Sequence, residues 1–384
     1  MCKNRHFTFI GLRLFMGAIV LAAFVIFGLP AVVHGEKEPV KPLSITVRTS
    51  PEAAFETRLD IYSAKLSKSV SALEPIELNR SEDSDVEIGW IDAAGRKRTY
   101  VLAENGELVD KQAGQVMLPT PQLREQLKRS AEQLRAVHYG KLVPWEQAKQ
   151  IVAKKDIVTV VDLETGLRFR AQRRAGSSHA DVQPVTKEDT RIMKQIYGGA
   201  WSWNRRAILV LKDRERIAGS MHGMPHGGDG IPDNEFSGHF CIHFQNSVTH
   251  GSGSLDPAHQ LMVMKAAGML RTYLAERSPY ELVDLFMSAL NQHDRHTASL
   301  MLAPEARDRF SAEGNDDPSI ESIHRLTPPV RSADSSALVD LEIPIKTVVT
   351  LHNRQKVKRT LRFILKRKAV NEAWKIERID NIPD

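Results

Sequence analysis

An uninterrupted apolar segment near the N-terminus constrains this chain most. Leu14 to Val33 are 20 residues without a charge, and every charged residue before them is basic. Such a segment is long enough to cross a bilayer with its basic flank on the cytoplasmic side. It also fits a secretory signal cleaved near Val33-His34-Gly35. Residues 1–35 are therefore expected to be a signal peptide or membrane anchor, and residues from about 36 onward to fold outside the cytoplasm.

Length and composition exclude several classes of protein. The 384 residues predict two or three domains, and 42% apolar with 26% charged residues exclude a largely disordered chain. Two cysteines exclude a disulfide-stapled scaffold and a four-cysteine zinc module. Since Cys2 precedes the apolar segment, the exported part holds Cys241 alone. The net charge of +6 falls to +3 without the three basic residues of the leader, which argues against a nucleic-acid partner.

The exported chain is expected to be a multidomain α+β protein. Residues 36–140 include a strand pair over 86–92 and 98–102 and a helix beginning at Thr120-Pro121, which predict a small α+β domain. Residues 141–276 predict a β-rich domain that holds the candidate site.

Residues 277–384 change character. A helix begins at Ser278-Pro279, and strand-like segments follow at Ala337–Ile345, Lys346–Leu351, Thr360–Arg367 and Trp374–Ile379. This order resembles the NTF2-like (SnoaL-type) α+β cone, which implies a third domain of that fold. Such folds host enzymes and accessory domains alike, and no acid–base pair is visible here, so we predict an accessory role.

Histidines gather in one part of the chain. Six of the 14 lie between residues 222 and 259: His222, His226, His239, His243, His250 and His259. Within Gly238–Phe244, alternation in a strand directs Phe240, Ile242 and Phe244 to the core and His239, Cys241 and His243 to the opposite face. This places a thiol between two imidazoles, and a nearby imidazolium favours the thiolate. The same alternation also fits a half-buried strand whose polar face is exposed to solvent.

A glycine-rich loop follows His222-Gly223 and could return His222 to the side of Cys241. A histidine, a loop and a strand bearing cysteine are a layout typical of nucleophilic catalysis. Here His222-Gly223 is followed, 15 residues on, by the sequence GHFCIH at 238–243. With the strand pair over 157–173, these residues resemble the L,D-transpeptidase (YkuD-type) catalytic domain over about 155–275. The chain departs from that family at Gly238, Phe240 and His243.

The resemblance implies a cofactor-free cysteine acyltransferase acting on peptidoglycan. Cys241 would attack a peptide carbonyl of the stem peptide, His222 would accept its proton, and His239 would assist. An amine acceptor gives transpeptidation, and water gives hydrolysis. Further residues expected around substrate or behind these groups are Ser220, Gly223, Ser237, His243 and His179.

Two alternatives stay open. Ser220-x-His222-x6-Asp229 resembles a stretch of zinc D,D-carboxypeptidases, which implies a zinc cofactor held by His222 and Asp229 with His239 or His243. The other alternative is a non-catalytic accessory protein that binds the cell wall. All three readings place the protein outside the cytoplasm, secreted or anchored through residues 14–33, with peptidoglycan as its partner.

Overall fold

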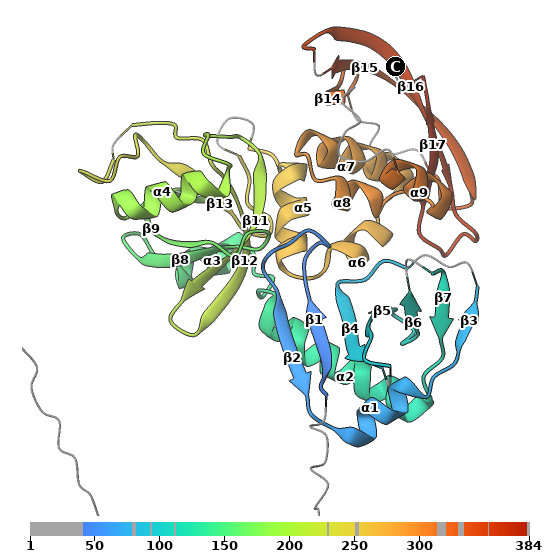
Figure 1. Ribbon diagram of the computed structural model, residues 1–384. Coiled ribbons are helices and arrows are strands. Elements are labelled where there is room, and N and C mark those ends of the chain that lie inside the picture. Colours follow the sequence, from blue (N-terminus) through green and yellow to red (C-terminus); the bar gives the residue numbers. More distant parts are fainter. Residues whose placement is uncertain are drawn as a thin grey trace, which may run out of the picture. The chain divides into compact units, whose positions relative to one another are not determined.

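The computed structural model describes residues 41–384 with short gaps, at 79–81, 93, 111–112, 229, 250–252, 313–319, 329–333, 352 and 382–384. The expected signal or anchor and the candidate ligand Asp229 lie outside these residues. No helix within the described ranges is long and apolar enough to span a membrane. The described chain belongs to one compact unit, Val40–Asp384, with three sheets (Figure 1). The predicted α+β class is confirmed.

The first sheet has the strand order β2-β1-β4-β5-β6-β7-β3. Its strands are β1 (Leu43–Val47), β2 (Thr57–Ile61), β3 (Pro75–Glu77), β4 (Val86–Ile91), β5 (Lys97–Leu102), β6 (Leu108–Asp110) and β7 (Gln115–Met117), with helices α1 (Ala64–Ser71) and α2 (Pro121–His138). The predicted helix start is confirmed, because Thr120 accepts a hydrogen bond from the Leu123 amide and Pro121 opens α2. Leu123 and Leu127 of α2 then pack on the sheet.

The second sheet closes on itself as a six-stranded barrel in the order β10-β13-β12-β11-β8-β9. Its strands are β8 (Ile157–Asp162), β9 (Arg168–Ala175), β10 (Ala180–Pro184), β11 (Arg205–Lys212), β12 (Glu215–His222) and β13 (Phe240–His243), with helices α3 (Trp145–Ile151), α4 (Lys187–Ile196) and α5 (Pro257–Ala266). Phe169, Phe240 and Phe244 fill its interior. Closure leaves no open edge, so every strand is held on both sides.

The third sheet runs β14-β15-β16-β17 and follows a group of short helices. These elements are α6 (Leu270–Ala275), α7 (Pro279–Asn291), α8 (Arg295–Ser299), α9 (Pro304–Ala312), β14 (Ile320–Arg325), β15 (Asp340–Leu351), β16 (Lys356–Lys366) and β17 (Lys375–Asp380). Phe286 of α7 contacts Phe363 of β16 with ring centroids 6.2 Å apart. The sequence predicts this order of helices and then strands. The two strands expected at Ala337–Ile345 and Lys346–Leu351 are instead one continuous strand, β15, and β14 lies where no strand is expected.

Main-chain hydrogen bonds join the segment after α2 to the barrel and to α5. The Lys141 amide donates to the Arg216 carbonyl, the Ala218 amide donates to the Lys141 carbonyl, and the Gly140 amide donates to the Ala266 carbonyl. A Cβ at Gly140 would lie 2.5 Å from the Ala218 nitrogen, so the approach requires glycine. On its other side, α5 shares an apolar core with α7 and the third sheet. Helix α5 and strand β12 are thus held rigidly where they meet the candidate site.

Candidate functional site

Strand β13 carries the candidate nucleophile between two neighbouring strands. Cys241 lies opposite Asp181 of β10, and His243 lies opposite Ser220 of β12. The predicted alternation is confirmed on the core side, since Phe240 and Ile242 belong to the barrel interior. The reading in which the other face is exposed to solvent is wrong. Cys241 and His243 are 4% and 2% exposed, because other histidines cover them.

His226 is the imidazole in contact with the thiol. Its Nε2 lies 3.4 Å from Cys241 Sγ, and its Nδ1 lies 3.1 Å from the Met224 carbonyl oxygen. A carbonyl only accepts hydrogen bonds, so Nδ1 donates and Nε2 of the neutral ring keeps its lone pair for the thiol proton. The loop is fixed at this point by two main-chain bonds between His226 and His239, of 2.9 and 2.8 Å.

Asp181 is the carboxylate of the site. Its Oδ1 lies 4.0 Å from Cys241 Sγ, 3.3 Å from His179 Nε2 and 3.9 Å from His239 Nε2. His179 is held from behind by a 2.7 Å contact between Nδ1 and the Val248 carbonyl. Burial, and then the nearby charge of Asp181, raise the pKa of Cys241 above its usual range. The resting cysteine is therefore a neutral thiol.

His222, the base expected from the sequence, lies beside the Cys241–His226 contact. Its ring centroid is 5.1 Å from that of His226, and one of its nitrogens lies within 4.8 Å of the other two donor atoms. Burial and the neighbouring His226 and Arg205 lower the pKa of His222 to about 2. His222 is therefore a neutral imidazole at physiological pH.

A column of stacked histidines lies behind the strand. The ring of His243 stacks on that of His259 at 3.7 Å and on that of His179 at 4.4 Å, with interplanar angles of 5° and 14°. Ser220 Oγ lies 2.8 Å from His259 Nδ1. All four residues are buried. The sequence predicts substrate or supporting roles for His243, His179 and Ser220. In the structure all three are buried behind Cys241 and support the site from the interior of the protein.

Gly223 and Ser237, which the sequence also placed near substrate, do not contact Cys241 in any way that the structure describes. Gly223 lies against the ring of Tyr197, where a Cβ would be 2.3 Å from the nearest ring carbon. Ser237 is exposed to solvent. Gly238 has φ +88°, and a Cβ there would lie 2.3 Å from the His226 carbonyl oxygen. This crowding and the positive φ explain why glycine occupies this position.

The sequence places His226 and His259 in the histidine-rich segment and Asp181 two residues after His179, but it assigns none of the three to the expected catalytic or substrate residues. A signal for His226 exists, because His226-Gly227 repeats the histidine–glycine pair of His222-Gly223 four residues later. Asp181 is brought in only by the pairing of β10 with β13. His259 sits in the first turn of α5, where Asp256 accepts from its amide at 3.1 Å.

An exposed aromatic ring and a half-buried imidazole lie at the edge of the cluster. Trp203 is 49% exposed, and its ring lies 4.7 Å from that of His222 and 5.3 Å from that of His226. The His239 side chain is 19% exposed. These two side chains mark the solvent side of an otherwise buried cluster.

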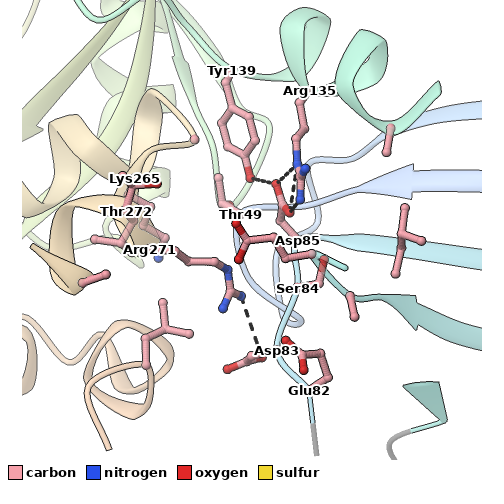
Figure 2. A pocket seen from close by; sticks show the side chains of 18 of the residues that line it. Thr49, Glu82, Asp83, Ser84, Asp85, Arg135, Tyr139, Lys265, Arg271 and Thr272 are labelled. Atoms are coloured by element: carbon pink, nitrogen blue, oxygen red, sulfur yellow. Dashed lines mark hydrogen bonds and ion pairs between the residues drawn. The ribbon is translucent and has the colours of Figure 1, made fainter. Parts of the chain in front are cut away.

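A separate pocket of about 660 Å³ lies away from Cys241, lined by α2, α6 and the residues before β4 (Figure 2). Its charged groups largely pair with one another. Asp85 accepts from Arg135 and, at 2.9 Å, from Tyr139, while Asp83 lies 4.0 Å from Arg271. The lining contains no cysteine, and we assign it no chemistry.

Comparisons with family models and with curated proteins find no match for this chain. The resemblances to L,D-transpeptidases and to NTF2-like domains therefore rest on the residues quoted above.

Proposed function

We propose that this protein is an exported cysteine acyltransferase or peptidase that acts on peptidoglycan stem peptides. The observation that carries the proposal is the 3.4 Å contact between Cys241 Sγ and His226 Nε2, with His226 Nδ1 held by the Met224 carbonyl. A nucleophile, a base within reach and a third group that orients the base are the arrangement that nucleophilic catalysis needs. His226 takes the role of base in this proposal, and His222 packs beside it.

The chemistry follows from the contact between the protonated thiol of Cys241 and Nε2 of His226. As Sγ attacks the substrate carbonyl, the thiol proton passes to His226 Nε2, which avoids a free thiolate beside Asp181. Collapse of the tetrahedral intermediate breaks the C–N bond, and the imidazolium returns the proton to the leaving amine. The resulting thioester is then attacked by an acceptor amine, which gives a new peptide bond, or by water, which gives hydrolysis.

The substrate and location rest on sequence. The apolar segment Leu14 to Val33 supports export or anchoring, and the spacing from His222-Gly223 to Cys241 supports a peptidoglycan substrate through the resemblance described above. The C-terminal helices and sheet fit an accessory, NTF2-like role in the same proposal.

The test is the cross-link profile of purified walls incubated with the protein, read by mass spectrometry of released muropeptides. We expect Cys241→Ala to abolish any change in the profile and His226→Gln to reduce its rate at least about 100-fold, the usual contribution of a general base. His324→Gln, an exposed histidine of β14, is the matched control and should keep full activity. A wall-bound protein that leaves the profile unchanged in all forms would instead favour the non-catalytic alternative.

A further inference from the structure

Three donor atoms of different residues converge at the site. A nitrogen of His222, Nε2 of His226 and Sγ of Cys241 all lie within 4.8 Å of one another. In a tetrahedral zinc site, bonds of about 2.3 Å to sulfur and 2.0–2.1 Å to nitrogen place S and N about 3.6 Å apart. The 3.4 Å between Cys241 Sγ and His226 Nε2 is close to that edge. One edge of the cluster therefore already has the length that a zinc site needs, and the third donor lies within 4.8 Å of both ends of that edge.

The three donor atoms are also of the chemical types that Zn²⁺ prefers, and the fold holds their residues in place. Thiolate and imidazole are the ligands that Zn²⁺ prefers, and three of them leave a fourth position for water. His226 Nδ1 is already bonded to the Met224 carbonyl, the kind of outer contact that directs Nε2 toward an ion. Cys241 is fixed on β13, and His222 ends β12. The backbone positions of Cys241 and His222 are therefore set by the barrel, and closing the site on an ion requires the His222 ring to move toward the other two donors.

The carboxylate of the site adds to this arrangement. Asp181 forms a second group of close donor atoms with His179 and Cys241, also within 4.8 Å. Beside a zinc–thiolate centre, which carries a net positive charge, the carboxylate of Asp181 offsets that charge.

We propose that His222, His226 and Cys241 bind Zn²⁺, and that the bound ion holds the enzyme inactive. Zinc binding uses the lone pairs of Cys241 Sγ and His226 Nε2. Acyl transfer requires the same two lone pairs, so a zinc-bound protein cannot be catalytically active. The ion displaces the thiol proton into solvent as it binds. The inhibitory effect rests on the proposed function, whereas metal binding itself does not.

Binding is tested on the metal-free full-length protein with Co²⁺ and Zn²⁺. We expect a single equivalent of Co²⁺ to give the near-ultraviolet charge-transfer band of a thiolate ligand together with intense visible bands of a tetrahedral ion, and Zn²⁺ to displace it. Cys241→Ser should abolish the thiolate band, and His222→Gln and His226→Gln should each weaken binding by more than about tenfold. His324→Gln should bind as the wild type. Absence of the band, or its survival in Cys241→Ser, overturns the site.

The functional consequence is tested without knowledge of the substrate. Zn²⁺ should slow the alkylation of Cys241 by iodoacetamide, followed by peptide mass spectrometry, and a chelator should restore the rate. In the wall assay, chelation should raise the turnover. If chelation instead abolishes turnover and Zn²⁺ restores it, the ion is a catalytic cofactor of a zinc-dependent peptidase, and the inhibitory role is overturned. Failure of the wall assay alone leaves the cobalt spectrum as an independent result.

Discussion

Asp181 lies directly opposite Cys241 in the β10–β13 pair, and its Oδ1 is 4.0 Å from the thiol sulfur. A carboxylate at that distance, in a buried setting, opposes ionisation of the thiol. The site is therefore built to keep Cys241 protonated until His226 takes the proton. This distinguishes it from cysteine sites that hold a resting thiolate.

Replacing this carboxylate should make the thiol easier to ionise. We expect Asp181→Asn to lower the pKa of Cys241 and to raise its rate of alkylation at pH 8, because one of the two causes of the raised pKa is removed. The measurement is the pH dependence of iodoacetamide modification. Asp213→Asn, at an exposed turn, is the control and should alkylate as the wild type. An unchanged profile for Asp181→Asn would show that burial alone sets the pKa.

Gly238 should be required for the placement of His226. At φ +88°, alanine is strained, and its Cβ would meet the His226 carbonyl oxygen at 2.3 Å. We expect Gly238→Ala to lower the free energy of unfolding by about 1–3 kcal/mol and to slow turnover without touching either reacting group. Urea denaturation and the wall assay measure the two effects. Gly228→Ala is the matched control in the same loop, because nothing lies within 4 Å of its Cβ. Equal behaviour of the two variants would contradict the argument.

The site could be predicted from sequence in part. Alternation placed Phe240 and Ile242 in the core and Cys241 on the other face, because a strand period depends only on neighbouring residues. The identity of the contacting base could not be predicted in this way. His222 and His226 carry the same histidine–glycine signal, and the choice depends on main-chain bonds between His226 and His239 across the loop.

Long-range pairing explains what else the sequence left out. Asp181 reaches Cys241 because β10 neighbours β13 in the closed barrel, although the two residues are 60 positions apart in the sequence. Helix α5 brings His259 to the same place through tertiary packing against β11 and β12. Local patterns predict helices and strands, such as α2 at Thr120-Pro121, but they do not specify which strands become neighbours.

Acid should destabilise the protein through histidines that are buried as neutral rings. Burial lowers the pKa of His138 to about 4 and contributes most to the pKa of about 2 for His222. Below about pH 6.5 the unfolded chain binds these protons first, so stability is full above that pH and falls as the pH decreases. Each such histidine contributes a loss of about 1.4 kcal/mol per pH unit until its folded pKa is reached.

The measurement of this effect is urea unfolding between pH 7.5 and pH 5. His138→Gln removes one titrating ring that lies outside the candidate site. The slope of the free energy of unfolding against pH should therefore decrease by the contribution of one proton, about 1.4 kcal/mol per pH unit. His324→Gln, at an exposed position, should leave the slope unchanged. A free energy of unfolding that does not vary across this range would contradict the assignment of neutral buried rings.

Lys265 should be the most sensitive charged position outside the site. It is 4% exposed, and its Nζ lies 2.7 Å from Glu164 Oε1 and 2.9 Å from Asp294 Oδ2, so it joins α5 to the barrel and to the start of α8. Lys265→Met leaves two half-buried carboxylates without their buried cation, and we expect a loss of about 3 kcal/mol in the free energy of unfolding.

Two comparisons isolate the buried charge as the cause. Lys356→Met, at an exposed position of β16, should change stability by less than about 0.5 kcal/mol. Adding Asp294→Asn to Lys265→Met should recover part of the loss, because one unpaired carboxylate is then removed. Urea unfolding of the three variants measures these differences, and a single variant Lys265→Met as stable as the wild type would contradict the argument.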